Sequence, residues 1–242
     1  MRVDVLGIPF DCLTPAQAVE RAAALTDAAK AARVVTPNPE IVWKCKNDVA
    51  AMRAVSSADL ILADGIGIVN AAKTLGRPLP GRVPGFDWAC ALLPELASRG
   101  KRLYLLGGKP GVAQTAADNL KAKFPDLTIC GVADGYFSDK AAAIETIRKT
   151  SPDVVFVCLG APRQELFMEE AAPLLGNVLM AGLGGSVDVW AGAVTRAPAV
   201  FCKLGIEWLY RALRQPSRIP RLFVLPRFMR AVKAQKRRES NG

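Results

Sequence analysis

Short runs of aliphatic and β-branched residues alternate with longer amphipathic stretches along most of the chain. The apolar runs predict β-strands at residues 34–36, 60–63, 103–106, 127–132, 154–159 and 178–181. Intervening stretches at residues 111–123, 139–149 and 164–175 have the periodicity of helices with one apolar face. Alternating strands and helices are typical of a parallel sheet covered by helices. The pattern therefore predicts an α/β fold with a Rossmann-like, mostly parallel sheet flanked by helices.

Capping residues mark the start of two further helices. Thr14, Pro15 and Gln17 form a capping-box sequence with proline at the first helical position. Asn38, followed by Pro39, predicts a second helix that begins directly after the first strand run.

The charge of the chain is concentrated at its C-terminal end. Residues 1–195 contain 20 Lys and Arg against 20 Asp and Glu, whereas residues 196–242 contain 12 Lys and Arg against two Glu. A neutral body with a cationic tail is typical of a protein held against an anionic partner, either a membrane face or a nucleic acid. We expect a core domain at 1–195 and a basic helical C-terminal appendage at 196–242.

The spacing of the cations predicts helices within this appendage. Pro216 and Pro220 disfavour one unbroken helix over its first part, so two short pieces with a bend are expected. One helical face would carry four arginines: Arg211, Arg214, Arg218 and Arg221. After Pro226, further cations recur at helical spacing, with Phe228 and Val232 on another side. They predict a basic, modestly apolar surface helix.

Composition limits the chemistry that this chain can perform. It contains no histidine, so a general base must be Asp, Glu, Lys, Tyr or Cys. No D-x-D or D-x-E sequence occurs, so the usual carboxylate pair for a metal-bound sugar nucleotide is missing, and no metal or cofactor is expected. Six scattered cysteines without a C-x-x-C pair are typical of reduced thiols in a cytoplasmic protein. Neither a secretory signal nor a membrane-spanning segment is predicted.

Five loops with unusual sequences follow directly after predicted strands. They lie at residues 36–40 (T-P-N-P-E), 63–67 (A-D-G-I-G), 107–111 (G-G-K-P-G), 160–165 (G-A-P-R-Q-E) and 182–188 (G-L-G-G-S-V-D). In open parallel sheets, ligands bind at the carboxyl ends of the strands. These loops are therefore the candidate functional site.

Three polar side chains in the first two loops have both a structural and a functional interpretation. Asp64 is either a turn residue that bonds its own backbone or a general base that accepts a proton from a substrate hydroxyl. Asn38 is either a helix cap or, with Thr36, a polar group that faces the same cleft as Asp64. The absence of histidine favours Asp64 as the base without deciding the matter.

The remaining loops contain candidates for contacts with a diphosphate. Gly107 and Gly108 begin a G-G-x-x-G sequence at a helix start, where backbone N–H groups bind phosphate, but a plain tight turn explains it equally well. Arg163 and Gln164 stand at a helix start and could contact phosphate or sugar. Arg82, in the sequence R-V-P-G-F-D, could oppose a leaving diphosphate, although a loop arginine is more often only solvated.

Taken together and in order, six motifs resemble those of the WecG/TagA/CpsF family of bacterial glycosyltransferases. They are T-P-N-P-E, A-D-G-x-G, R-V-P-G-F-D, G-x-P-x-Q-E, G-x-G-G-x-x-D and E-W-L-Y-R, and the resemblance runs from the N-terminal strand to about Arg221. Such enzymes transfer a sugar, typically N-acetylmannosamine, from a UDP donor to an undecaprenyl-diphosphate-linked acceptor sugar. The transfer proceeds with inversion and without a metal.

The resemblance implies roles for individual residues. Asp64 is the expected catalytic base, with Thr36 as a second catalytic residue. The residues expected to bind substrate are Asn38, Arg82, Asp87, Gly107, Gly108, Gln164, Glu165 and Gly184. Four cations of the appendage are expected at the lipid diphosphate and the membrane: Arg211, Arg214, Arg218 and Arg221.

The resemblance also implies partners and a location. We expect a UDP-sugar donor, polyprenyl-diphosphate-linked GlcNAc as acceptor, and the anionic inner face of the plasma membrane, with no nucleic acid. The expected process is the synthesis of cell-wall teichoic acid or of another surface glycan.

Several alternatives stay open on the sequence. The donor could be UDP-glucose or a UDP-ManNAc uronate, used in exopolysaccharide synthesis. A nucleotide-cofactor oxidoreductase would share the alternating pattern, but G-x-G-x-x-G with an acid about 20 residues further on is absent. A nucleic-acid-binding module would explain the basic tail but not the Asp and Gly loops. The oligomeric state is open too, a homo-oligomer included.

Overall fold

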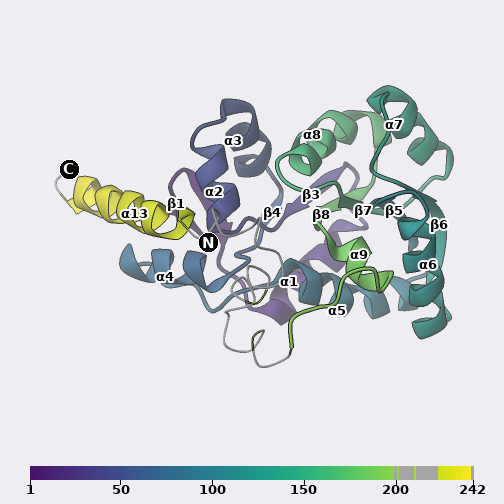
Figure 1. Ribbon diagram of the computed structural model, residues 1–242, viewed down its shortest axis with the longest axis horizontal. Helices are drawn as coiled ribbons and strands as arrows, with labels where there is room; N and C mark the ends of the chain where they lie inside the picture. Colours follow the sequence, from purple (N-terminus) through teal and green to yellow (C-terminus); the bar gives the residue numbers. More distant parts are fainter. Residues whose placement is uncertain (199–200, 202–209, 211–222, 241–242) are drawn as a thin grey trace.

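A six-stranded parallel sheet forms the centre of the structure (Figure 1). The computed structural model describes residues 1–198, 201, 210 and 223–240. The strands are β3 (Ala32–Val35), β4 (Leu60–Ile61), β5 (Arg102–Gly107), β6 (Thr128–Ala133), β7 (Val154–Cys158) and β8 (Leu179–Gly182). Their order is β4-β3-β8-β7-β5-β6, and every neighbouring pair is parallel. The six predicted strands and the α/β fold class are confirmed.

Alternate residues of each strand pack on opposite faces of the sheet, which is why the strand sequences are apolar throughout. In β7, Val155 and Val157 belong to one core cluster, whereas Val154 and Phe156 belong to the other. Every residue of β7 and β8 is buried. These central strands therefore appear in the sequence as continuous hydrophobic runs rather than as alternating patterns.

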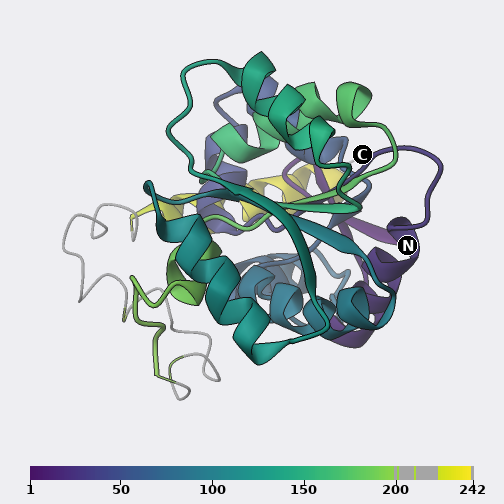
Figure 2. The ribbon, with the colours of Figure 1, turned by 90° about the vertical axis from the view of Figure 1, so that its right-hand side faces the viewer.

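Two layers of helices cover the two faces (Figure 2). One face carries α2 (Pro39–Cys45), α3 (Val49–Ser56), α4 (Ile66–Thr74), α7 (Lys140–Lys149) and α8 (Arg163–Leu175). The other carries α1 (Pro15–Leu25), α5 (Gly85–Ser98), α6 (Val112–Lys123) and α9 (Ser186–Trp190). Because all six strands run in one direction, the loops that leave their carboxyl ends lie along one edge of the sheet.

The predicted helix starts are confirmed in atomic detail. The hydroxyl of Thr14 accepts the Gln17 N–H at 3.3 Å, and the Gln17 side chain accepts the Thr14 N–H at 2.9 Å. Asn38 Oδ1 accepts the Ile41 N–H at 3.0 Å, so the first turn of α2 is capped by a side chain. Each cap satisfies N–H groups that have no partner within the helix.

A short N-terminal hairpin was not among the strands predicted from the apolar runs. Strands β1 (Arg2–Val5) and β2 (Ile8–Asp11) pair antiparallel around Leu6 and Gly7, both of which have positive φ. Asp11 ties the hairpin to the sheet, because its carboxylate accepts the Ile61 N–H of β4 at 2.8 Å. Four-residue strands around a turn without Asn or Pro give only a weak local signal.

The last described helix, α13 (Val224–Ser240), packs against the body beside α2 and α4 (Figure 1). The predicted helix is confirmed, but its apolar side is not part of a surface: Phe228 and Val232 are fully buried in the core cluster. Gln235 secures the contact, accepting the Leu6 N–H at 2.9 Å and donating to Asp4 Oδ1 at 2.9 Å. The outward side of α13 exposes cations: Arg227, Arg230, Lys233, Lys236, Arg237 and Arg238.

Within the described part of the chain, no helix is both long enough and apolar enough to cross a membrane.

Candidate functional site

The loops after β3 and β4 lie against each other at the carboxyl edge of the sheet. The Leu62 N–H donates to Val35 O at 2.9 Å, and the Asp64 N–H donates to Pro37 O at 3.3 Å. Asp64 is half-buried, and Gly65, which follows it, lies immediately before α4 with a φ of +114°. This positive φ requires glycine and turns the chain sharply after Asp64. Asp64 is therefore held between two backbone segments at the start of a helix.

Thr36 joins three of these loops. Its side chain is 7% exposed, and its hydroxyl donates to Gly182 O, at the end of β8, at 3.2 Å. A Cβ placed on Gly85 would lie 2.8 Å from Thr36 Oγ1, so glycine is needed where α5 begins. The Val83 N–H also donates to Ala63 O at 2.8 Å. The sequence R-V-P-G-F-D thus lies beside both Thr36 and the strand end that precedes Asp64.

Asp87 forms an ion pair that local sequence did not indicate. Arg196 Nη2 lies 2.5 Å from Asp87 Oδ1, and its guanidinium lies 4.9 Å from the centre of the Phe86 ring. Arg196, the first residue of the basic segment, is therefore in contact with the start of α5. Arg82, three residues before Gly85, is half-buried in the same loop.

Gln164 connects the start of α8 to the glycine loop after β8. Its side chain is 3% exposed, and Oε1 accepts the Gly184 N–H at 2.9 Å. Nε2 donates to Glu165 Oε1 at 2.9 Å. A Cβ on Gly182 would lie 2.9 Å from Nε2, so only glycine fits between this amide and Thr36. Gln164 and Thr36 therefore approach Gly182 from the segments that follow β7 and β3, the two neighbours of β8.

Glu165 is the most deeply buried carboxyl of the site. The residue is 2% exposed, and burial raises the pKa of its carboxyl above the ordinary value, an effect that the Gln164 hydrogen bond partly offsets. Its second oxygen, Oε2, lacks a hydrogen-bond partner within the described structure. As a substrate contact Glu165 stays a prediction.

Gly107 and Gly108 lie at the end of β5 and are closely packed. Their φ angles are +140° and +74°, and a Cβ on Gly107 would lie 2.3 Å from Cys158 O. Gly108 O accepts the Gly135 N–H, from the loop after β6, at 2.9 Å. This packing alone requires glycine at both positions. A role of these residues in binding phosphate stays a prediction.

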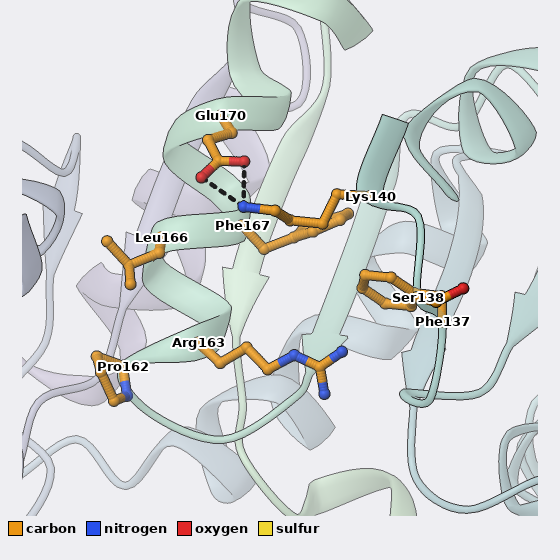
Figure 3. Close-up of a pocket in the computed structure, with 8 residues that line it drawn as sticks. All are labelled: Phe137, Ser138, Lys140, Pro162, Arg163, Leu166, Phe167 and Glu170. Atoms are coloured by element: carbon orange, nitrogen blue, oxygen red, sulfur yellow. Dashed lines mark hydrogen bonds and ion pairs between the residues drawn. The ribbon is translucent and has the colours of Figure 1, made fainter. Parts of the chain in front are cut away.

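A hollow of about 420 Å³ opens beside the start of α8 (Figure 3). Arg163 stacks over the Phe137 ring, with 4.9 Å between Cζ and the ring centre, and Lys140 pairs with Glu170 across the hollow. None of the residues predicted to bind substrate lines it; its walls are Phe137, Ser138, Lys140, Pro162, Arg163, Leu166, Phe167 and Glu170. Of these residues, Arg163 is the one that the sequence offers as a candidate for contact with phosphate or sugar.

The structure thus gathers most of the predicted residues along the carboxyl edge. Thr36, Asn38, Asp64 and Arg82 come from three adjoining loops, and Gln164 and Gly184 meet beside them. Four predicted cations lie outside the described residues: Arg211, Arg214, Arg218 and Arg221. Across the described ranges, no group of three or more Cys, Asp or Glu side chains is placed to hold a metal ion.

The fold and the site define an α/β protein whose polar and glycine loops converge at the carboxyl edge of a parallel sheet. Residues 3–242 match the model of the family described as "Glycosyl transferase WecG/TagA/CpsF family". The chain belongs to this family and is a glycosyltransferase, which confirms the resemblance seen in the motifs.

Three curated relatives carry the name N-acetylglucosaminyldiphosphoundecaprenol N-acetyl-beta-D-mannosaminyltransferase. The relative from Bacillus spizizenii strain W23 is 38% identical over 206 residues, covering 85% of this chain and 80% of its own length. That from Bacillus subtilis strain 168 is 35% identical, covering 82% and 78%. That from Staphylococcus aureus strain MW2 is 34% identical over 240 residues, covering 98% and 94%.

Proposed function

We propose that this glycosyltransferase transfers N-acetylmannosamine from a UDP donor to GlcNAc linked to undecaprenyl diphosphate, in the synthesis of cell-wall teichoic acid or a related surface glycan. The observation that carries the proposal is the match to relatives of this name, one of which is 34% identical over 94% of its length. The convergence of the Asp64, Thr36 and Gly182 loops at one edge of the sheet supports it. The family assignment also favours it over the oxidoreductase and nucleic-acid alternatives for the body.

Asp64 acts as the general base in this proposal. Its carboxylate removes the proton from the acceptor hydroxyl as that oxygen forms a bond to the anomeric carbon of the donor sugar. The bond between the anomeric carbon and the UDP oxygen breaks in the same displacement, so the configuration inverts. A positioned base contributes about 10²–10⁴-fold to such a step. Thr36 positions the site through its bond to Gly182 O.

The leaving UDP gains negative charge and needs donors that are already in place. Backbone N–H groups of the glycine loops and the guanidinium of Arg82 supply them, because fixed dipoles and charges stabilise developing charge without reorganising. Asn38 lines the sugar and diphosphate positions, and Gln164 shapes them through its bond to the Gly184 N–H. Asp87 holds Arg196 at 2.5 Å, which places a second cation next to the Arg82 loop.

The reaction proceeds without a metal in this proposal. Metal-dependent transferases hold Mg²⁺ or Mn²⁺ through carboxylates that also reach substrate phosphates, and the chain has no D-x-D or D-x-E sequence. Activity should therefore survive EDTA. Complete loss on chelation, restored by Mn²⁺, would show that a metal takes part.

The enzyme reaches its lipid-linked acceptor by docking peripherally on the anionic inner face of the membrane. The exposed cations of α13 and the arginines of the segment before it provide the charge, at about 1 kcal/mol for each cation near an anionic leaflet. Phe228 and Val232 belong to the body, so α13 contributes charge rather than apolar insertion.

One assay tests the reaction. Purified protein is incubated with a synthetic lipid-diphosphate-GlcNAc acceptor and a panel of UDP-sugars, and product is detected by mass spectrometry. The proposal expects UDP-N-acetylmannosamine to be the preferred donor. Preference for UDP-glucose or a UDP-ManNAc uronate would move the chain to another activity within the family, and no transfer from any UDP-sugar would refute the proposed donor class.

Docking is tested by neutralising charges rather than by truncation, because removing α13 would uncover the core. Changing Arg227, Arg230, Lys233 and Arg237 to Gln should abolish flotation with anionic liposomes and leave UDP binding intact. A matched control changes four exposed cations of the body: Arg21, Lys121, Lys123 and Lys149. Equal loss of flotation in both variants would refute a docking role for α13.

A further inference from the structure

The buried carboxyl group of Glu165 has no role in the proposed mechanism. The residue is 2% exposed, so its carboxyl cannot reach a ligand at the surface. One oxygen accepts the Gln164 amide at 2.9 Å, whereas Oε2 has no partner in the described part of the protein. Burial of a carboxyl with an unsatisfied oxygen is costly, and such a group calls for an explanation.

The surroundings of this carboxyl are those of an interior group. Cys45, on α2, has its pKa raised to about 12, first by burial and then by the nearby Glu165. Lys44 is the nearby cation that favours the charged form of Glu165, and its Nζ lies 3.2 Å from Glu40 Oε1. The side-chain hydrogen bond to the Glu165 carboxyl comes from Gln164, and the backbone of Glu165 itself also favours the charged form.

Gln164 is a primary amide whose two ends have nearly the same shape but opposite hydrogen-bonding character. Its oxygen must face the Gly184 N–H, because an NH₂ group there would set donor against donor. Its nitrogen must face an acceptor, which is the Glu165 carboxyl. Glu165 therefore selects one of two orientations of the amide.

The loop that this amide holds is uncovered by the described residues. A Cβ on Gly184 would meet none of their atoms within 4 Å, and its φ of +56° is left-handed. On the other side, Gly182 is fixed between Gln164 and Thr36. Within the described structure, the loop after β8 is thus held by contacts on its inner side and uncovered on its outer side, which suits a backbone surface that binds a diphosphate.

We propose that Glu165 is a positioning residue for the donor site: it fixes the orientation of the Gln164 amide, which in turn holds the Gly184 N–H and shapes the 182–185 loop that binds the UDP diphosphate. This inference rests on the proposed function for the identity of the ligand. In this proposal Glu165 does not contact the substrate directly but acts through Gln164.

A double-mutant cycle on UDP affinity tests this action. Glu165→Met keeps the volume but removes the acceptor, and it should weaken the Kd of UDP, measured by calorimetry, by about tenfold. Glu165→Gln, which can still present an oxygen to Gln164, should restore affinity to within about twofold of the wild type. Combining Glu165→Met with Gln164→Met should weaken binding no more than Gln164→Met alone. Wild-type affinity in folded Glu165→Met, or additive losses, would overturn the proposal.

Amide hydrogen exchange gives a second readout that needs no ligand. Glu165→Asp withdraws the carboxyl from Gln164 with little change in volume, and it should speed exchange of the Gly184 N–H by about tenfold, whereas Glu165→Gln should not. The Leu183 N–H, which bonds Val157 O at 2.9 Å, is the internal reference and should stay unchanged. Equal exchange at Gly184 in all variants would overturn the proposal even if Glu165→Met fails to fold.

If wild-type protein does not bind UDP, the proposed function fails, and the exchange result still decides the role of Glu165.

Discussion

Two buried polar side chains in this protein have their hydrogen bonds satisfied to different degrees. Gln235 fastens α13 to the body and makes bonds to Leu6, Asp4 and Glu239, at 2.9 Å for the closest contact with each. Glu165, at the start of α8, has one bond to a side chain and one buried oxygen without a partner in the described structure.

The difference separates an interface that serves stability from a site that serves chemistry. Where a polar group only joins two elements, a fold gains most by pairing each of its atoms. An unsatisfied carboxyl lowers stability and persists where its position is needed for something else. We therefore expect the α13 interface to govern unfolding and the carboxyl edge to govern turnover.

The largest effect on turnover, with little effect on stability, is expected at Asp64. Asp64→Asn removes the base and keeps the size of the side chain, so kcat should fall by about 10²–10⁴-fold. UDP affinity and melting temperature should change little. Steady-state kinetics, calorimetry and thermal melting on one preparation test this. A variant that keeps more than roughly a tenth of wild-type turnover would exclude Asp64 as the base.

At Phe228, by contrast, the expected effect is on stability. This ring is fully buried between α13 and the body, and Phe228→Ala should lower the free energy of unfolding by about 3–5 kcal/mol. Phe223, which is 65% exposed, is the matched control, and Phe223→Ala should change stability by no more than about 0.5 kcal/mol. Urea unfolding measures both. Similar effects of the two changes would mean that α13 is not part of the core.

Thr36 should give a smaller effect on activity than Asp64. Thr36→Val removes the hydroxyl that donates to Gly182 O and keeps the shape, which should lower kcat/KM by about fivefold, corresponding to about 1 kcal/mol. Thr36→Ser keeps the hydroxyl and should retain most activity. If the serine variant is as impaired as the valine variant, the methyl group rather than the hydrogen bond is what matters.

The smallest effect is a pH dependence of stability at Glu165. Burial raises the pKa of this carboxyl in the folded state, so the folded protein holds the proton more tightly than the unfolded chain. Stability therefore falls as pH rises from the ordinary carboxyl pKa through the raised value. Glu165→Gln has no carboxyl to titrate, so its melting temperature should gain on the wild type as pH rises above the ordinary carboxyl pKa. A difference that is constant with pH would contradict the raised pKa.

The sequence predicted those features of the structure that depend on residues close together along the chain. The six strands appear as apolar runs because both faces of the sheet are covered, and the caps at Thr14 and Asn38 act within three residues. The candidate loops followed from the strand ends and from the motifs they carry. The approach of Gln164 to Gly184 could not be predicted in this way, because it joins segments 20 residues apart.

The errors and omissions concern contacts that are distant along the chain. Phe228 and Val232 have the spacing of a surface helix, and only the fold shows that α2 and α4 cover them. Gln235 bonds to Leu6, 229 residues away, and nothing local to either residue signals it. The pair between Asp87 and Arg196 likewise depends on how α5 lies relative to the end of α9.

The stereochemistry of the product tests the central claim, a single displacement with Asp64 as base, most directly. The anomeric configuration of the product formed in EDTA from UDP-α-N-acetylmannosamine and the lipid-diphosphate-GlcNAc acceptor can be read by NMR from the one-bond C–H coupling at the new linkage. The account predicts a β-linked product, because one in-line attack inverts the anomeric carbon. An α-linked product would contradict it, since retention requires a different mechanism in which Asp64 is not simply the base.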